Sequence, residues 1–132
     1  MIVADTTLVT YFLIDGQFTA EAERVRARDV DWIAPRLLRS ELLNVLSSYI
    51  RFRGMDRDLA VKLFRRGISM VDMTDPDPDP VEVLNISQAG PCTGYDAEFV
   101  WLARRRNVRF VTTDGELLGA FPDVAVHPSQ FA

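Results

Sequence analysis

The chain has very little cysteine and histidine, the residues that many catalytic and structural metal sites use. Its 132 residues include one cysteine, Cys92, and one histidine, His127. A single cysteine excludes a disulfide within the chain and a cysteine-based zinc cluster, which fits a reducing compartment. We interpret Cys92 as a small loop or core residue. With one histidine, next to Pro128 near the end of the chain, neither a serine–histidine triad nor an imidazole metal site is well supported.

Long hydrophobic runs are missing as well. No apolar stretch approaches the ~18 residues of a membrane span, and the start of the chain meets Asp5 after three apolar residues, with no basic segment before it. We therefore expect no export signal, no membrane anchor and a cytoplasmic location. An apolar fraction of 48% over 132 residues is enough for one core of ordinary size. We expect one domain over residues 1–132.

Positive charge comes from fourteen arginines and one lysine, and the net charge is −4. This balance argues against a surface that binds nucleic acid by bulk positive charge, but it leaves room for a local basic surface. Arg104, Arg105 and Arg109 lie close together in the sequence, and the planar guanidinium group suits phosphate. Alternatively, arginines at the end of a helix face water and complement the helix dipole. Both interpretations stay open.

The hydrophobic pattern predicts alternating short strands and helices. Strands are expected at 2–4, 31–34, 68–73, 108–111 and 124–126, and helices at 6–13, 19–28, 35–53, 56–66, 81–89, 96–106 and 116–121. The proline-rich run 75–80 is expected to be a stiff loop that ends in a helix N-cap at Asp79. The order indicates an α/β three-layer sandwich with a mainly parallel five-stranded sheet flanked by helices, and ligands at the carboxyl ends of the strands.

Three aspartates fall at that edge of the predicted sheet. Asp5 follows the first strand and Asp114 follows the fourth. Asp96 begins the helix that precedes the fourth strand. Because aspartate is a favoured helix N-cap, capping is a strong alternative for each of them taken singly. Taken together, their shared edge favours one common site.

Glu41 is the fourth acid, within or beside the apolar stripe of helix 35–53. A carboxylate on an apolar face costs several kcal/mol unless it is paired, binds a metal or takes up a proton; the alternative is a flank position that reaches solvent. Four clustered carboxylates would repel one another, and a divalent cation such as Mg²⁺ or Mn²⁺ would relieve that repulsion. We expect no histidine, cysteine or lysine in the cluster, so water is the expected nucleophile.

The four acids and their neighbours resemble the PIN-domain family, particularly the VapC-like toxins of bacterial and archaeal toxin–antitoxin pairs. The resemblance covers essentially the whole chain and rests on IVADTT around Asp5, APRLLRSELLNVL around Glu41, YDAEFVWLA around Asp96 and FVTTDGELL around Asp114. It implies a PIN-like sandwich and a metal-dependent ribonuclease, an endonuclease that hydrolyses RNA phosphodiester bonds. The four acids would be its catalytic residues and the ligands of one or two Mg²⁺ or Mn²⁺ ions.

The resemblance also implies further residues and partners. Thr7 and Thr112 stand where the family tends to place hydroxyl groups beside the acids. The expected partners are an RNA substrate, a cognate antitoxin protein and a second copy in a homodimer, with no membrane. The candidate residues for RNA contact remain Arg104, Arg105 and Arg109, from the charge pattern described above.

Two other functions compete with this one. An aspartyl-phosphate phosphatase also begins with an aspartate after its first strand, but it generally needs a second acid two residues later, and Thr7 stands there. The other is a non-catalytic PIN-like module that binds RNA or a partner protein. The presence of all four acids argues against it, and activity that survives EDTA would argue against the metal nuclease.

Overall fold

The computed structural model describes residues 1–131 and contains a five-stranded parallel sheet. The strands are β1 Ile2–Ala4, β2 Trp32–Ile33, β3 Val71–Asp72, β4 Arg109–Val111 and β5 Ala125–Val126. They lie in the order β3-β2-β1-β4-β5, and every neighbouring pair is parallel. The predicted α/β architecture with five strands between helices is confirmed, and the sheet is entirely rather than mainly parallel.

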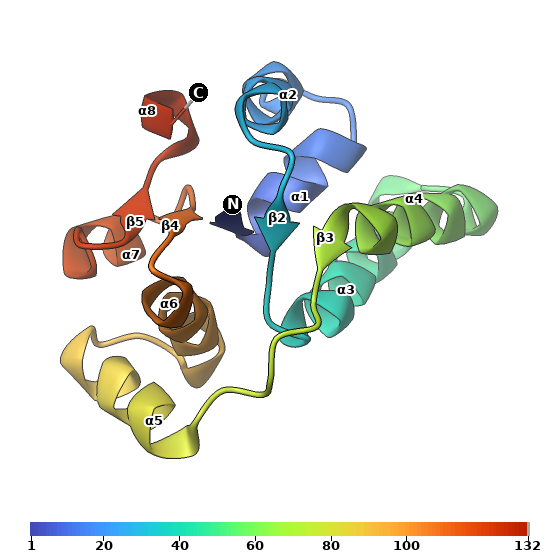
Figure 1. Cartoon of the computed structure of the whole chain (residues 1–132). Helices are drawn as coiled ribbons and strands as arrows, with labels where there is room; N and C mark the ends of the chain where they lie inside the picture. The colour runs from blue at the N-terminus through green and yellow to red at the C-terminus, as the bar shows by residue number, and fades with distance from the viewer. Residues whose placement is uncertain (132) are drawn as a thin grey trace.

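Helices cover both faces of the sheet (Figure 1). They are α1 Thr6–Leu13, α2 Thr19–Arg28, α3 Leu37–Arg53, α4 Arg57–Met70, α5 Pro80–Ala89, α6 Gly94–Arg106, α7 Gly115–Ala120 and α8 Pro128–Phe131. Helix α1 contacts α2, α3 and α4, whereas α6 lies against β1 and β4 and contacts α5. The described chain has no helix both long and apolar enough to cross a membrane.

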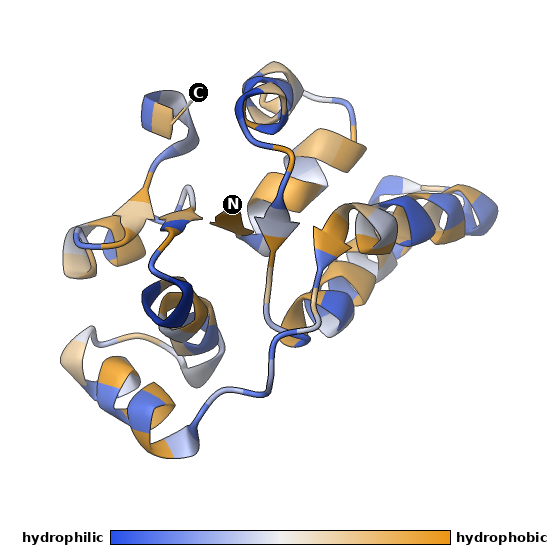
Figure 2. Cartoon of the chain, in the orientation of Figure 1, coloured by the Kyte–Doolittle hydropathy of each residue, from blue (hydrophilic) through white to orange (hydrophobic). Residues whose placement is uncertain are grey.

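The core forms where the central strands meet the helices. All residues of β1 and β2 are buried, as expected for parallel strands covered on both faces. Phe99 of α6 stacks on Phe110 of β4, with 5.7 Å between the ring centroids. Figure 2 shows hydrophobic residues along β1, and both hydrophobic and hydrophilic residues along α3 and α4. The central strands thus have fixed positions, and so do the loops that follow them.

The prediction of a strand at 68–73 is wrong except for Val71–Asp72, because α4 continues to Met70. Gly67 of α4 is buried, and a Cβ atom there would lie 2.7 Å from Cδ2 of Leu42 and 3.0 Å from Cδ1 of Leu13. The small residue lets α4 pack closely on α1 and α3, and this packing keeps the following apolar residues helical. Smaller differences are that α3 begins at Leu37 rather than at residue 35, that α6 begins at Gly94 rather than at residue 96, so that Gly94 and Tyr95 are helical and not the end of a loop, and that the short helix α8 was not predicted.

The ends of several helices follow the expected local chemistry. Asp79 caps α5, since its carboxylate accepts a hydrogen bond of 3.0 Å from the backbone N–H of Glu82, and Pro80 begins the helix. Gly54 and Asn107, which end α3 and α6, have φ angles of 65° and 53°. This left-handed conformation is common after the last helical turn.

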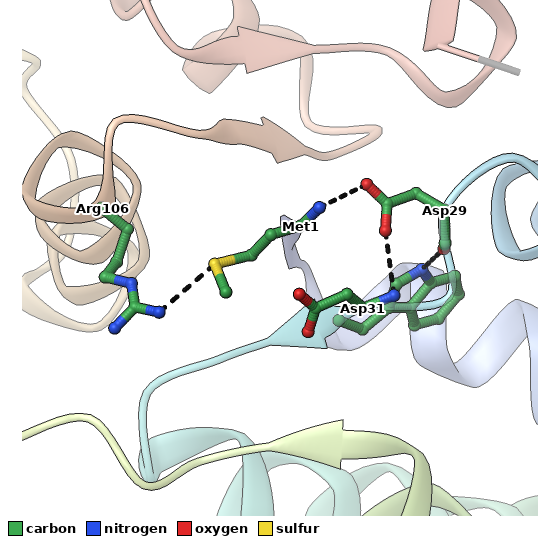
Figure 3. Close-up of polar contacts among 5 residues, drawn as sticks. Met1, Asp29, Asp31 and Arg106 are labelled. Atoms are coloured by element: carbon green, nitrogen blue, oxygen red, sulfur yellow. Dashed lines mark hydrogen bonds and ion pairs between the residues drawn. The ribbon is translucent and has the colours of Figure 1, made fainter.

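A polar network holds the amino end of β1 beside β2 (Figure 3). The Met1 amino group donates to Oδ2 of Asp29, and Oδ1 of Asp29 accepts from the backbone N–H of Asp31. The indole N–H of Trp32 donates to the Asp29 carbonyl at 2.8 Å. These contacts lie at the edge of the sheet opposite to the one at which Asp5 follows β1.

Candidate functional site

A pocket of about 720 Å³ lies at the carboxyl edge of the sheet and is lined by all four predicted acids. Asp5 directly follows β1, Glu41 comes from α3, Asp96 stands in the first turn of α6, and Asp114 precedes α7. The parallel sheet places the ends of β1 and β4 side by side, and α3 and α6 bring the other two acids to them. The structure therefore brings together the four residues that the sequence singled out.

Helix capping accounts for only one of the three aspartates. Oδ1 of Asp114 accepts hydrogen bonds of 2.9 and 3.2 Å from the first backbone N–H groups of α7. Asp5 occupies the N-cap position of α1, but its side chain makes no capping hydrogen bond. The cap of α6 is Thr93, whose Oγ1 accepts from the backbone N–H of Asp96 at 3.1 Å. The carboxylates of Asp5 and Asp96 thus have no capping role.

Two threonine hydroxyl groups donate to acids in the pocket. Oγ1 of Thr112 donates to Oδ2 of Asp5 at 2.6 Å, so Thr112 lies beside an acid as expected. Oγ1 of Thr6 donates to Oε1 of Glu41 at 2.7 Å, a contact that the sequence did not reveal. Thr7 lines the pocket, but Thr6 is the member of the pair that bonds to an acid. These bonds fix one oxygen of each carboxylate.

Burial and neighbouring negative charge raise the pKa values of three of the acids, Asp5, Glu41 and Asp96. Burial is the largest cause of the rise in the pKa of Asp5 to about 6; the Thr112 hydrogen bond opposes the rise, and the charges of Glu41 and Asp96 add to it. Burial, followed by the charge of Asp96, raises the pKa of Glu41 against the Thr6 hydrogen bond. Burial, followed by the charges of Asp114 and Glu116, raises the pKa of Asp96. The pocket therefore concentrates negative charge.

The donor set of the pocket suits a hard divalent cation, because it consists of carboxylate and hydroxyl oxygens. A cation would also relieve the repulsion that adds to the effect of burial on the pKa values. Within residues 1–131, however, no three histidine, cysteine or acidic side chains stand close enough to form a ready ligand set. A bound ion would therefore have to draw the acids together through side-chain movements.

Cys92 lies nearer to the acids than the sequence suggested. It lines an adjoining pocket of about 350 Å³, in which Asp96 and Asp114 form a wall shared with the larger pocket. Burial and the charges of these two aspartates raise the pKa of the Cys92 thiol. Cys92 is thus a neighbour of the acids but does not line their pocket, and the raised pKa keeps its thiol protonated and makes it a poor nucleophile.

The three arginines assigned to RNA contacts lie away from the acids. Arg104 donates to Asp123 through two hydrogen bonds, of 3.0 and 3.2 Å, and Arg105 lies over the ring of Trp101 at 5.3 Å. Arg109 donates to two backbone carbonyl oxygens at the edge of β5. Arg104 and Arg105 are in the last turn of α6, which is about 20 Å long, and Asp96 is in its first turn. The structure does not bring these arginines to the pocket.

Sequence reasoning missed one wall of the pocket. Leu37, Glu41, Asn44 and Val45 all line it from α3, and their spacing of four, seven and eight residues is that of one helix face. This periodicity could have revealed Asn44 as a neighbour of Glu41. Tyr95, on the opposite side, directly precedes Asp96 and is 63% exposed.

Comparisons with known proteins define the fold. The sequence matches no protein-family model and no curated protein. Among solved structures, it is similar to the crystal structure of PAE2754 from Pyrobaculum aerophilum, with a TM-score of 0.78 and 20% sequence identity. The match covers 98% of this chain and 85% of that one. The chain therefore shares its whole architecture with that protein.

Proposed function

We propose that the chain is a Mg²⁺- or Mn²⁺-dependent ribonuclease of the PIN-domain, VapC-like kind that its acidic motifs resemble. The observation that carries the proposal is the convergence of Asp5, Glu41, Asp96 and Asp114 on one pocket, where burial and mutual charge raise the pKa values of the first three. Without a counter-charge, this arrangement destabilises the folded chain. A bound cation would supply that counter-charge and stabilise the cluster of acids.

The carboxylates of these four acids would hold the cation. A divalent ion there would supply positive charge for an RNA phosphate and lower the pKa of a water molecule. Thr112 and Thr6 orient Asp5 and Glu41 by donating hydrogen bonds to them. The Asp114 carboxylate is oriented by the backbone N–H groups of α7. Hydrogen bonds within the chain therefore orient three of the four carboxylates toward fixed positions.

The chain's own residues favour water as the nucleophile. Cys92 stays protonated, and the residues that line the pocket include no histidine or lysine. Hydrolysis by water does not use the ribose 2′-hydroxyl as nucleophile, so the products should carry a 5′-phosphate and a 3′-hydroxyl.

The proposal extends to partners. As a toxin of a toxin–antitoxin pair, the chain would cleave RNA in the cytoplasm, form a homodimer and be inhibited by a cognate antitoxin protein. These statements rest on the resemblance of the four acidic motifs. A small reading frame just upstream, encoding a DNA-binding segment and an apolar, arginine-bearing tail, would support the antitoxin.

A cleavage assay tests the proposal. Purified chain should cleave single-stranded RNA in Mg²⁺ or Mn²⁺ and should lose that activity in EDTA. Asp5→Asn should be inactive, whereas Asp31→Asn, which changes an exposed acid outside the pocket, should cleave at the wild-type rate. Activity that survives EDTA would refute the metal-dependent mechanism.

The second candidate function is a non-catalytic module that binds RNA or a protein. It is favoured by the lack of a ready ligand set among the described side chains. The same assay separates the two, because such a module would bind RNA but leave it intact in Mn²⁺.

A further inference from the structure

The lining of the large pocket combines two kinds of residue. Besides the four acids, it includes Leu37, Ser40, Asn44 and Val45 of α3 and Tyr95 of α6. The volume of about 720 Å³ lies within the range of about 300 to 1,000 Å³ typical of pockets that bind small organic ligands. It exceeds what one or two metal ions need, so the pocket has space for part of a substrate beside the acids.

Tyr95 is the aromatic residue that lines the pocket. The other two tyrosines use their rings within the protein: Tyr11 packs on Phe18 with 4.7 Å between centroids, and the Arg53 guanidinium lies 5.4 Å from the ring centroid of Tyr49. Within residues 1–131, Tyr95 makes no aromatic or cation–π contact of this kind, and 63% of its surface is exposed. Its ring is therefore available to a ligand.

The α3 side offers what a nucleobase needs besides a stacking partner. Leu37 and Val45 supply aliphatic surface, while Asn44 and Ser40, both exposed, supply hydrogen-bond donors and acceptors. A base has two apolar faces and a polar edge, so an aromatic ring, an aliphatic wall and an amide together complement it. Bases in a duplex keep their faces stacked on one another, which favours a single-stranded ligand.

We propose that the part of the pocket lined by Tyr95 and Asn44 is a base subsite. Tyr95 stacks there on an unpaired RNA base next to the cleaved phosphate, and Asn44 contacts the edge of that base. The assignment of RNA as the ligand rests on the proposed function. The position follows from the chain, because Tyr95 directly precedes Asp96 and Asn44 lies one helical turn after Glu41. Beyond Asp96 and Asp114, the adjoining pocket gives the strand a continued path.

The test compares binding by three variants. In Mg²⁺, Tyr95→Ala should raise KM for single-stranded RNA about tenfold, the usual order for loss of one base–aromatic stack. Tyr95→Phe should keep the wild-type KM, because the ring remains. Phe52→Ala serves as the matched control, since Phe52 is an aromatic residue that is 73% exposed at the end of α3 and does not line the pocket.

A double-mutant cycle makes the readout specific. Removing a single base beside the cleaved phosphate should weaken wild-type binding more than tenfold but should cause a much smaller loss in Tyr95→Ala, which keeps only the Asn44 contact with that base. Equal losses in both proteins, or a wild-type KM for Tyr95→Ala, would overturn the base subsite.

The cycle is separable from the proposed function. If the chain binds RNA without cleaving it, the ribonuclease proposal fails, and the same cycle is measured on Kd by fluorescence anisotropy, with the base removed at each position in turn. If the chain binds no RNA at all, both proposals are overturned.

Discussion

The hydroxyl of Thr112 donates a hydrogen bond of 2.6 Å to Oδ2 of Asp5, and so links the residue that follows β4 to the residue that follows β1. Oγ1 of Thr112 also accepts a hydrogen bond of 3.1 Å from the backbone N–H of Asp114. One buried hydroxyl thus holds two of the four acids in register. Thr112 therefore connects the end of the sheet with the acids of the pocket, because its backbone N–H also donates to the carbonyl of Val126 in β5.

Replacing Thr112 tests that role. Thr112→Val keeps the shape of the side chain but removes the hydroxyl, so Asp5 loses a donor and the Asp114 N–H loses an acceptor. We expect the free energy of unfolding to fall by about 1–3 kcal/mol in urea titrations, because buried polar groups lose their partners. Thr112→Ser is the control, and it should recover most of the loss. Equal stability of Thr112→Val and wild type would contradict the role.

The raised pKa of Asp5 predicts that the metal-free chain loses stability as pH rises. Below the ordinary pKa of 3.8, Asp5 is protonated in both states; above it, the unfolded chain releases the proton, while the folded chain keeps it until about pH 6. The free energy of unfolding should therefore fall by about 2 kcal/mol between pH 4 and pH 7 from this group. The raised pKa values of Glu41 and Asp96 act in the same direction.

Asp5→Asn isolates this effect from other groups. Asp29, Asp72 and Asp123 have lowered pKa values, whose stabilising contribution is lost on acidification, and they remain in the variant. In EDTA, the variant should gain stability relative to wild type as pH increases from 4 to 7, measured by urea unfolding. A difference that stays constant over this range would show that Asp5 titrates normally.

Divalent ions should raise the melting temperature. A ligand that binds only the folded state stabilises it by mass action, about 2.7 kcal/mol at 100 times its Kd. Mg²⁺ or Mn²⁺ should therefore raise Tm in differential scanning calorimetry, and Asp96→Asn should reduce the response. Asp31→Asn should respond like wild type. No shift of the wild-type Tm in millimolar Mn²⁺ would exclude strong binding.

Gly67 should tolerate no larger side chain. Gly67→Val would place atoms against Leu42 and Leu13, where even a Cβ atom approaches to 2.7 and 3.0 Å, so we expect a loss of about 1–3 kcal/mol in stability. Gly119→Ala in α7 is the control, because a Cβ atom there meets nothing within 4 Å. It should be neutral or slightly stabilising, as alanine favours helix. If Gly67→Val unfolds at the wild-type urea concentration, the close packing of α4 is wrong.

Much of the fold was predictable because local signals and packing agree. Gly54 ends α3, Asp79 caps α5, and the short apolar runs of β1 and β4 form buried central strands. The strand expected at 68–73 was wrong because its apolar residues fit both a strand and a buried helix. The close approach of Gly67 to Leu42 of α3 and Leu13 of α1 favours the helix, and these contacts are long-range in the sequence.

The sequence was enough to predict the acids of the pocket but not its other lining residues, such as Asn44 and Tyr95. Strand-end placement brought Asp5 and Asp114 to one edge, since parallel strands share their carboxyl ends. Which carboxylate caps a helix depends on side-chain direction, and this explains why Asp114 caps α7 while Thr93 replaces Asp96 as the cap of α6. Tyr95 gives no signal of its own in the sequence, because its exposure follows from how α6 packs.

The rate of RNA cleavage by wild type and by the four amide variants tests the account most directly. Asp5→Asn, Glu41→Gln, Asp96→Asn and Asp114→Asn keep the shape of each acid but remove the charge that would hold the cation. The account predicts that wild type in Mn²⁺ gives products with a 5′-phosphate and a 3′-hydroxyl. Each variant should have the circular dichroism spectrum of a folded protein and cleave at least about 100-fold more slowly than wild type. Products with a 2′,3′-cyclic phosphate, or wild-type rates for Asp5→Asn and Asp114→Asn, would contradict it.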